Sequence, residues 1–234
     1  YMREALALSP ESSNIIFNMG LVFYQSGRID DSIREYEECI RRDPSHERVY
    51  GAICYPLKDL GRFQEAIFYS DKYLELTGGD YDSYLARADI LSSMVRPDDA
   101  IGYYSLAIDC SECGLDATVS RSMSYLLIGD FNKGWRDFDF RFGLEKLRGL
   151  FIDDRYRHMV SIEQLKGKRV LVYGEQGAGD IIQFSRYIKI LENYASEIIV
   201  DVNDGVWSVL SSMSCSVLKR KNSELKANDY AIPV

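Results

Sequence analysis

Three short stretches of the chain share one pattern: SGRIDDSI at 26–33, LGRFQEAI at 60–67 and MVRPDDAI at 94–101. Each stretch begins 34 residues after the one before it. A glycine stands second in the first two, as is typical of a turn between helices. The first half of the chain is therefore predicted to repeat one structural unit.

Extending the alignment predicts repeats that begin at Ser13, Glu47, Tyr81 and Leu115. A small residue that lets two helices cross closely recurs at Gly20, Cys54, Ala88 and Ser122. The turn glycine recurs at Gly27, Gly61 and Gly129, and valine replaces it at Val95. A second small position holds Ser32, Ala66, Ala100 and Gly134, and an aromatic position holds Tyr36, Ser70, Tyr104 and Phe138.

A period of 34 residues resembles that of the tetratricopeptide repeats, and the resemblance covers residues 1–145. It implies helical hairpins that stack into a solenoid with a concave inner surface. Pro10 stands one period before Pro44, which closes the first repeat. We therefore expect residues 1–12 to be the end of a truncated repeat.

The resemblance also implies which positions line the concave surface, namely the second, fifth, ninth and twelfth of each repeat. In the first three repeats these are Asn14, Phe17, Leu21, Tyr24, Arg48, Gly51, Tyr55, Lys58, Asp82, Leu85, Asp89 and Ser92. The set is aromatic and mixed in charge, and it lacks repeated Lys and Arg that would clamp a carboxylate. We expect a protein or peptide partner of unspecified class; alternatively, the groove packs against the chain's own C-terminal part.

The hydrophobic period changes in the second half. After a linker at 146–166, apolar runs typical of buried parallel strands occur at 168–174, 197–203 and 216–220. Helices are expected at 180–194 and 204–213, the first with an apolar stripe. Residues 167–234 are therefore predicted to begin a Rossmann-like α/β sheet, whose ligands lie outside the carboxyl ends of the strands.

A glycine-rich turn, YGEQGAGDIIQFSRY at 173–187, follows the first predicted strand. It has the spacing of a phosphate-binding P-loop, but Asp180 replaces the lysine that holds the phosphates. It supplies two glycines of a dinucleotide fingerprint, but Ile182 replaces the third. Neither motif is complete.

The segment GKRVLVYGEQGAGDIIQFSRY at 167–187 resembles bacterial tetratricopeptide proteins whose C-terminal half is similar to the heptosyltransferases, inverting sugar transferases of the GT-B fold. GWRDFDFRF at 134–142 and YAIPV at 230–234 resemble flanking segments of those proteins. The resemblance implies that residues 167–234 are the N-terminal half of a GT-B fold. The half that binds the nucleotide sugar would be missing.

This resemblance implies that Asp180 is the catalytic base for the acceptor hydroxyl. It implies that Glu175, Gln176, Gly177, Gly179 and Arg186 bind the substrates, with the glycines letting the backbone approach a diphosphate. A structural alternative makes Asp180 the N-cap of a helix, in a capping box with Gln183.

Two functions follow from these patterns. The first is transfer of a sugar from a nucleotide-sugar donor to a protein or glycan acceptor that the repeats recruit. No further cofactor is expected. This chain alone is expected to be inactive and to bind nucleotide sugars weakly. The alternative is a non-catalytic tetratricopeptide scaffold for protein–protein interaction.

The composition limits which partners, metal sites and cellular compartment are expected. A net charge of -8 and a pI near 4.9 argue against nucleic acid as the main partner. The five cysteines are scattered, which favours a reducing, cytoplasmic compartment. Cys110 and Cys113 form one CxxC without a second pair, so no metal site is expected. No apolar run reaches the length of a membrane span.

Overall fold

The computed structural model describes residues 12–111, 114–144, 157–158, 162–174, 177–211, 217–219 and 230–233. Its contacts divide the chain into two units, Tyr1–Leu144 and Glu145–Val234. The boundary lies next to the predicted end of the repeats at residue 145. The expected truncated repeat at 1–12 lies, except for Ser12, outside the described residues.

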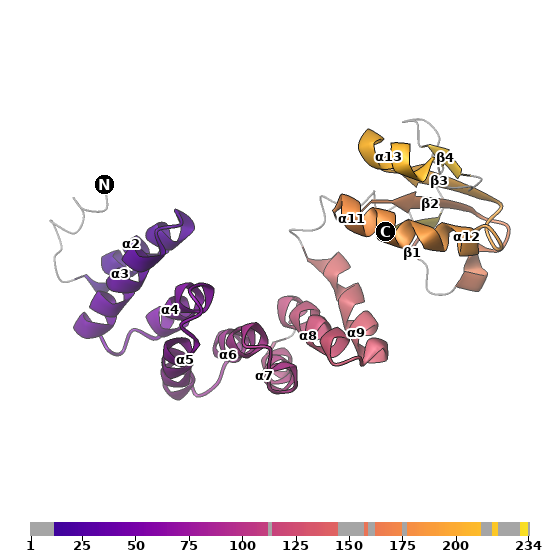
Figure 1. Ribbon diagram of the computed structural model, residues 1–234. Coiled ribbons are helices and arrows are strands. Elements are labelled where there is room, and N and C mark those ends of the chain that lie inside the picture. The colour runs from indigo at the N-terminus through magenta and orange to yellow at the C-terminus, as the bar shows by residue number, and fades with distance from the viewer. Residues whose placement is uncertain are drawn as a thin grey trace. The chain divides into compact units, whose positions relative to one another are not determined.

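The first unit is a series of helical hairpins (Figure 1). The helices are α2 (Ser13–Gln25), α3 (Ile29–Arg42), α4 (Glu47–Asp59), α5 (Phe63–Thr77), α6 (Tyr81–Ser93), α7 (Pro97–Asp109), α8 (Leu115–Leu127) and α9 (Phe131–Phe138), followed by a 3-10 turn, Asp139–Gly143. The first helix of each hairpin begins at the residue where the repeat was predicted to begin. A helical solenoid of tetratricopeptide type, as predicted, is therefore present.

The turn inside each hairpin has the same hydrogen bonds, in which a backbone N–H reaches back to a carbonyl of the last helical turn. These bonds are Arg28 N to Phe23 O, Arg62 N to Leu57 O, Arg96 N to Leu91 O and Asp130 N to Tyr125 O, at 2.8 to 3.0 Å. They are the long bonds of a Schellman motif, which places one residue in the left-handed region. That residue is Gly27, Gly61, Val95 or Gly129.

Val95 is strained by this turn, because it has a φ of 56° and is the only described residue other than glycine with a positive φ. A left-handed conformation costs an L-residue about 1–2 kcal/mol. The side chain is 70 % exposed, so it contributes little packing in return.

Val95→Gly is therefore expected to raise the free energy of unfolding by about 1 kcal/mol, because relief of strain exceeds the entropy cost of glycine. Urea denaturation of the full chain measures it. Gly61→Val is the matched control: Gly61 has a φ of 70° with open space around it, so this variant should lose a similar amount. A Val95→Gly protein no more stable than the parent would contradict the account.

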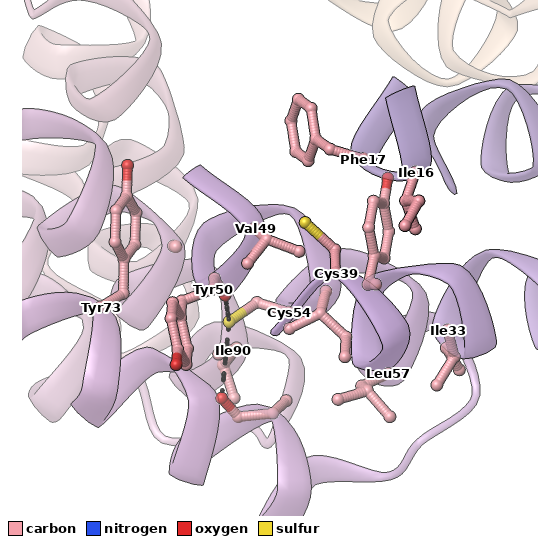
Figure 2. Packing of buried hydrophobic residues seen from close by; sticks show 14 residues of the cluster. Ile16, Phe17, Ile33, Cys39, Val49, Tyr50, Cys54, Leu57, Tyr73 and Ile90 are labelled. Carbon is pink, nitrogen blue, oxygen red and sulfur yellow. Dashed lines mark hydrogen bonds between the residues drawn. The ribbon is translucent and has the colours of Figure 1, made fainter. Parts of the chain in front are cut away.

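The small-residue register has a direct packing reason. A Cβ on Gly20 would lie 2.5 Å from the ring of Tyr36, which is fully buried between α2 and α3. In the second repeat the positions equivalent to Gly20 and Tyr36 hold Cys54 and Ser70, which are both small. The Cys54 thiol donates to Tyr50 O at 3.0 Å. Figure 2 shows this core, with side chains from α2 to α6 interleaved across consecutive hairpins.

The second unit contains a parallel sheet with the strand order β1-β5-β2-β3-β4. The strands are β1 (Arg157–His158), β2 (Arg169–Tyr173), β3 (Glu197–Asp201), β4 (Val217–Lys219) and β5 (Tyr230–Pro233). Val170, Val172, Ile198 and Val200 are buried on one face, under α11 (Ala178–Phe184), α12 (Ile188–Leu191) and α13 (Asp204–Leu210). Near-continuous burial of β2 and β3 is typical of parallel strands.

Two boundaries in this unit differ from those expected. The region assigned to a linker, 146–166, contributes β1 to the sheet and a 3-10 turn, Ile162–Leu165, whose Leu165 is fully buried in the core of the unit. The predicted helix 180–194 begins earlier, at Ala178, and is interrupted by a 3-10 turn at Ser185–Tyr187. The parallel order alone does not identify the unit as half of a GT-B fold.

Candidate functional site

The inner surface of the repeat unit is made by the first helix of each hairpin. Helices α2 and α4, α4 and α6, and α6 and α8 contact one another in addition to their sequence neighbours. Such contacts between alternate helices place α2, α4, α6 and α8 along one side of the solenoid. The predicted groove positions all lie on these helices.

A pocket of about 300 Å³ opens on this surface where α2, α4 and α6 meet, and we call it the groove pocket. It is lined by Phe17, Leu21, Tyr24, Tyr36, Arg48, Gly51, Ala52, Tyr55, Tyr73, Asp82 and Ala86. The structure therefore brings together most of the predicted groove residues of the first two repeats and one of the third. Its volume lies at the lower end of the range typical of ligand pockets and is large enough for one large side chain.

Gly51 lies in the wall of the groove pocket. The equivalent positions of the other repeats hold the larger residues Phe17, Leu85 and Val119. A Cβ on Gly51 would lie 2.6 Å from the ring of Tyr73, which packs across the glycine from α5. The missing side chain thus lets the Tyr73 ring, which comes from the second layer of helices, pack into the wall of the groove pocket.

The hydroxyl of Tyr36 is the one unusual polar group of the lining. Tyr36 is fully buried, and its oxygen has no hydrogen-bond partner within the described structure. Burial raises the pKa of this phenol to about 12, so it is neutral at physiological pH. By contrast, the Tyr24 hydroxyl donates to Asp59 at 2.7 Å. A buried hydroxyl without a partner costs free energy and calls for an explanation.

Two cations of α4 stand beside aromatic rings of the groove. The Arg48 guanidinium lies 5.1 Å from the centre of the Phe17 ring, and the Lys58 ammonium lies 5.4 Å from that of Tyr55. Within the described ranges neither side chain forms an ion pair. Both can accept an anionic partner without losing an existing salt bridge.

Acidic groups follow in the next repeat. Asp82 is exposed on the edge of the groove pocket, and Asp89 accepts a hydrogen bond from the Tyr104 hydroxyl at 2.8 Å. Burial raises the pKa of Asp89, although the Tyr104 hydrogen bond and the Lys58 charge oppose the shift. The groove therefore changes from cationic on α4 to anionic on α6.

The remaining predicted groove residues lie outside the pocket lining. Asn14 is exposed and its side-chain oxygen lies 3.2 Å from Nε2 of His46, while Leu85 packs with the third repeat. Sequence reasoning missed Tyr36, Ala52, Tyr73 and Ala86. Tyr36 and Tyr73 belong to the second helices of their hairpins; the pairing of an aromatic residue with Gly20 and Gly51 is the signal that could have found them.

A second pocket, of about 480 Å³, lies at the last hairpin. It is lined by Ile108, Ser111, Thr118, Arg121, Tyr125, Lys133, Arg136, Asp137 and Phe140. Arg121 occupies the same repeat position as Arg87, and each contacts the preceding hairpin: Arg87 pairs with Asp71 at 2.9 Å, and Arg121 donates to Ser105 at 3.0 Å. Arg121 also pairs, within its own hairpin, with Asp137 at 2.8 Å. The charges of this pocket are therefore largely engaged in packing the solenoid.

The predicted catalytic residues lie in the α/β unit. Asp180 is exposed in the first turn of α11, at the carboxyl end of β2, and Gly179 stands beside it in the helix. Arg186 is exposed and its guanidinium lies 5.0 Å from the centre of the Tyr187 ring. Glu175 and Gln176 lie outside the described residues. No described contact joins Asp180 to Arg186.

The N-cap interpretation of Asp180 was wrong. Because α11 begins at Ala178, its N-cap is Gly177, and no side chain caps the helix by a hydrogen bond. The capping box with Gln183 is therefore absent. Gly174 has a packing role instead: a Cβ there would lie 2.5 Å from the side chain of Ile181.

No cluster of three or more His, Cys, Asp or Glu side chains in the described ranges could hold a metal ion. No helix of the described part combines the length and hydropathy needed to cross a membrane.

Comparison with known proteins concerns the repeats. The family model for the tetratricopeptide repeat matches residues 13–46. No curated protein matches the chain.

Several solved structures are similar. A crystal structure of MamA has a TM-score of 0.54 and 18 % identity, covering 64 % of this chain and 88 % of that one. A thermophilic TPR protein of Thermus thermophilus has a TM-score of 0.55 and 12 % identity, covering 62 % and 80 %. YrrB, described as a TPR protein with an unusual peptide-binding site, has a TM-score of 0.50 and 15 % identity, covering 62 % and 75 %.

Identities this low show the fold alone. Together with the 34-residue register and the repeated turn, these comparisons make the first unit a tetratricopeptide-repeat solenoid.

Proposed function

We propose that the protein is an interaction scaffold whose concave surface binds an extended segment of a partner protein in the groove pocket. The observation that carries this proposal is the pocket itself, which gathers aromatic rings on the inner surface beside Arg48 and Lys58, two cations that form no ion pair within the described ranges. Aromatic residues and arginine are the side chains that most often dominate binding energy.

Several features support a peptide rather than a small metabolite. The pocket is open on the inner surface, and its lining carries charges of both signs, Arg48 and Asp82. The partly buried Leu85 lies outside the lining, on the next inner helix. An extended chain can place successive side chains along such a row of alternate helices, whereas a small ligand would fill only the pocket.

Tyr55→Ala is the variant that tests this proposal. Tyr55 lines the groove pocket on α4, so its truncation should weaken peptide binding at least tenfold, as for an aromatic anchor. Peptides selected from a random display library on the full chain, then titrated by calorimetry against both proteins, provide the measurement.

Phe68→Ala is the matched control. Phe68 is an aromatic residue of α5 that is 56 % exposed and lies outside the pocket lining, so its loss should leave affinity unchanged. If selected peptides bind the Tyr55→Ala protein as tightly as the parent, the groove is not the binding site.

Sugar transfer is a second candidate function, and the scaffold is the better supported of the two, since neither the matched family model nor the reported structures point to a transferase. One observation favours the second candidate: the strand order reverses beside β2, between β3 and β5, and Asp180 is exposed at the carboxyl end of β2. In parallel α/β sheets ligands bind at such a switch point. A nucleotide sugar would then be the donor, with no further cofactor.

Nucleotide release separates the two functions. Sugar transfer requires that the protein release nucleotide from a uridine or guanosine diphosphate sugar, and that Asp180→Asn abolish the release because an amide cannot accept a proton. Because this chain alone is expected to be inactive, the assay uses a protein that also carries the nucleotide-sugar-binding half, and absence of release from every such sugar by that protein would remove this candidate. A cytoplasmic location is part of both proposals, resting on the odd number of scattered cysteines.

A further inference from the structure

We infer that the groove pocket selects a tyrosine of the partner peptide, with acidic residues of the peptide beside Arg48 and Lys58 and basic residues beside Asp82 and Asp89. This inference rests on the proposed function, because it specifies the ligand of the same site.

The lining selects an aromatic side chain. Rings of Phe17, Tyr24, Tyr36, Tyr55 and Tyr73 surround the pocket, together with the small Gly51, Ala52 and Ala86. Aromatic pairs prefer offset or edge-to-face geometry, and walls made of rings at several angles provide it. The volume of about 300 Å³ is enough for one ring with its methylene group.

The Tyr36 hydroxyl distinguishes tyrosine from phenylalanine. Tyr36 belongs to the second layer of helices, behind α2, and its oxygen is fully buried without a partner. The phenol of a tyrosine can exchange a hydrogen bond with this hydroxyl once the side chains that cover it move aside on binding, whereas a phenylalanine would leave it unpartnered. Sites built to hydrogen-bond a ligand hydroxyl reject the analogue that lacks it.

Charged side chains of α4 and α6 beside the groove pocket select the charged residues that flank the tyrosine of the peptide. Arg48 and Lys58 on α4 have no ion pair within the described ranges, and Asp82 on α6 is exposed. Because α4 and α6 contact each other along the groove, a peptide that crosses from one to the other passes from cations to carboxylates. Complementary charges fix the register of a bound chain and reject the reversed order.

The test uses short acetylated and amidated peptides with a central tyrosine between two glutamates and two lysines. Both charge orders are made, and each is matched by a peptide with phenylalanine at the centre. Fluorescence anisotropy with the full 234-residue chain measures the affinities. We expect one charge order to bind at least tenfold more tightly than the other, and tyrosine to bind three- to tenfold more tightly than phenylalanine.

Tyr36→Phe supplies the decisive control. It removes only the hydroxyl, so the tyrosine and phenylalanine peptides should bind this variant equally, while the melting temperature of the free protein should equal or exceed that of the parent. A merely structural role for Tyr36 would leave the peptide preference unchanged in the variant, and that result would overturn the inference.

Other outcomes separate this inference from the proposed function. If the parent binds the tyrosine and phenylalanine peptides equally, and Tyr55→Ala still weakens both, the tyrosine selectivity is overturned and the groove remains the binding site. Equal binding of the two charge orders would overturn the assignment of the flanking charges. No binding of any peptide at millimolar concentration would overturn both.

Discussion

Arg121→Met is expected to lower the free energy of unfolding by about 2–3 kcal/mol. Arg121 is 19 % exposed, its guanidinium pairs with the 11 % exposed carboxylate of Asp137 at 2.8 Å, and it also donates to Ser105 at 3.0 Å. Removing one member of a buried pair leaves the other charge desolvated, which costs about 3–5 kcal/mol at a fully buried site and less here because some solvent reaches both groups. Chemical denaturation measures the loss.

The matched control for Arg121 is Arg96→Met. Arg96 pairs with Asp99 at 2.6 Å, but the two side chains are 51 % and 49 % exposed. Such surface pairs contribute about 0–1 kcal/mol, so this variant should remain close to the parent. Equal losses in the two variants would show that Arg121 does not tie the last two hairpins together.

Gly20→Ala is expected to lower the free energy of unfolding by about 2 kcal/mol. The new methyl group would lie 2.5 Å from the Tyr36 ring, so this fully buried ring or the helix that carries it would have to shift. Overpacking of this kind costs about 1–3 kcal/mol, which exceeds the gain in helix propensity over glycine.

Gly102→Ala adds the same methyl group to a helix with no atom within 4 Å of it. Here only the backbone effect remains, and the variant should gain about 0.5–1 kcal/mol. Thermal and urea denaturation measure the change in the free energy of unfolding of both variants. A loss for Gly20→Ala and a gain for Gly102→Ala would show that the small residue recurs at the Gly20 position because two helices cross closely there. A neutral Gly20→Ala would contradict that explanation.

Much of the repeat unit could be predicted from sequence because one period is imposed by one packing geometry. The small residue at Gly20 and the turn residue at Gly27 follow from helix crossing and from the left-handed turn, so their recurrence predicts where helices begin and end. The inner positions Phe17, Arg48 and Tyr55 follow from the same register.

The rest depends on contacts that a repeat alignment does not contain. Tyr73 packs into the pocket wall against Gly51, where one repeat departs from the pattern, and the unpartnered state of the Tyr36 hydroxyl depends on every atom around it. Asp180 was predicted to be the N-cap of the first helix, but the N-cap of α11 is Gly177, three residues earlier. A rule that looks for a polar N-cap residue does not predict this start.

The most direct test of the central claim is an amide chemical-shift titration of the full chain with the tyrosine peptide in its tighter charge order. The account predicts saturable shifts at Gly51, Tyr55 and Asp82, which line the groove pocket, and none at Phe68 on α5. Shifts confined to Phe68 and its neighbours, or to the residues around Asp180, would contradict it.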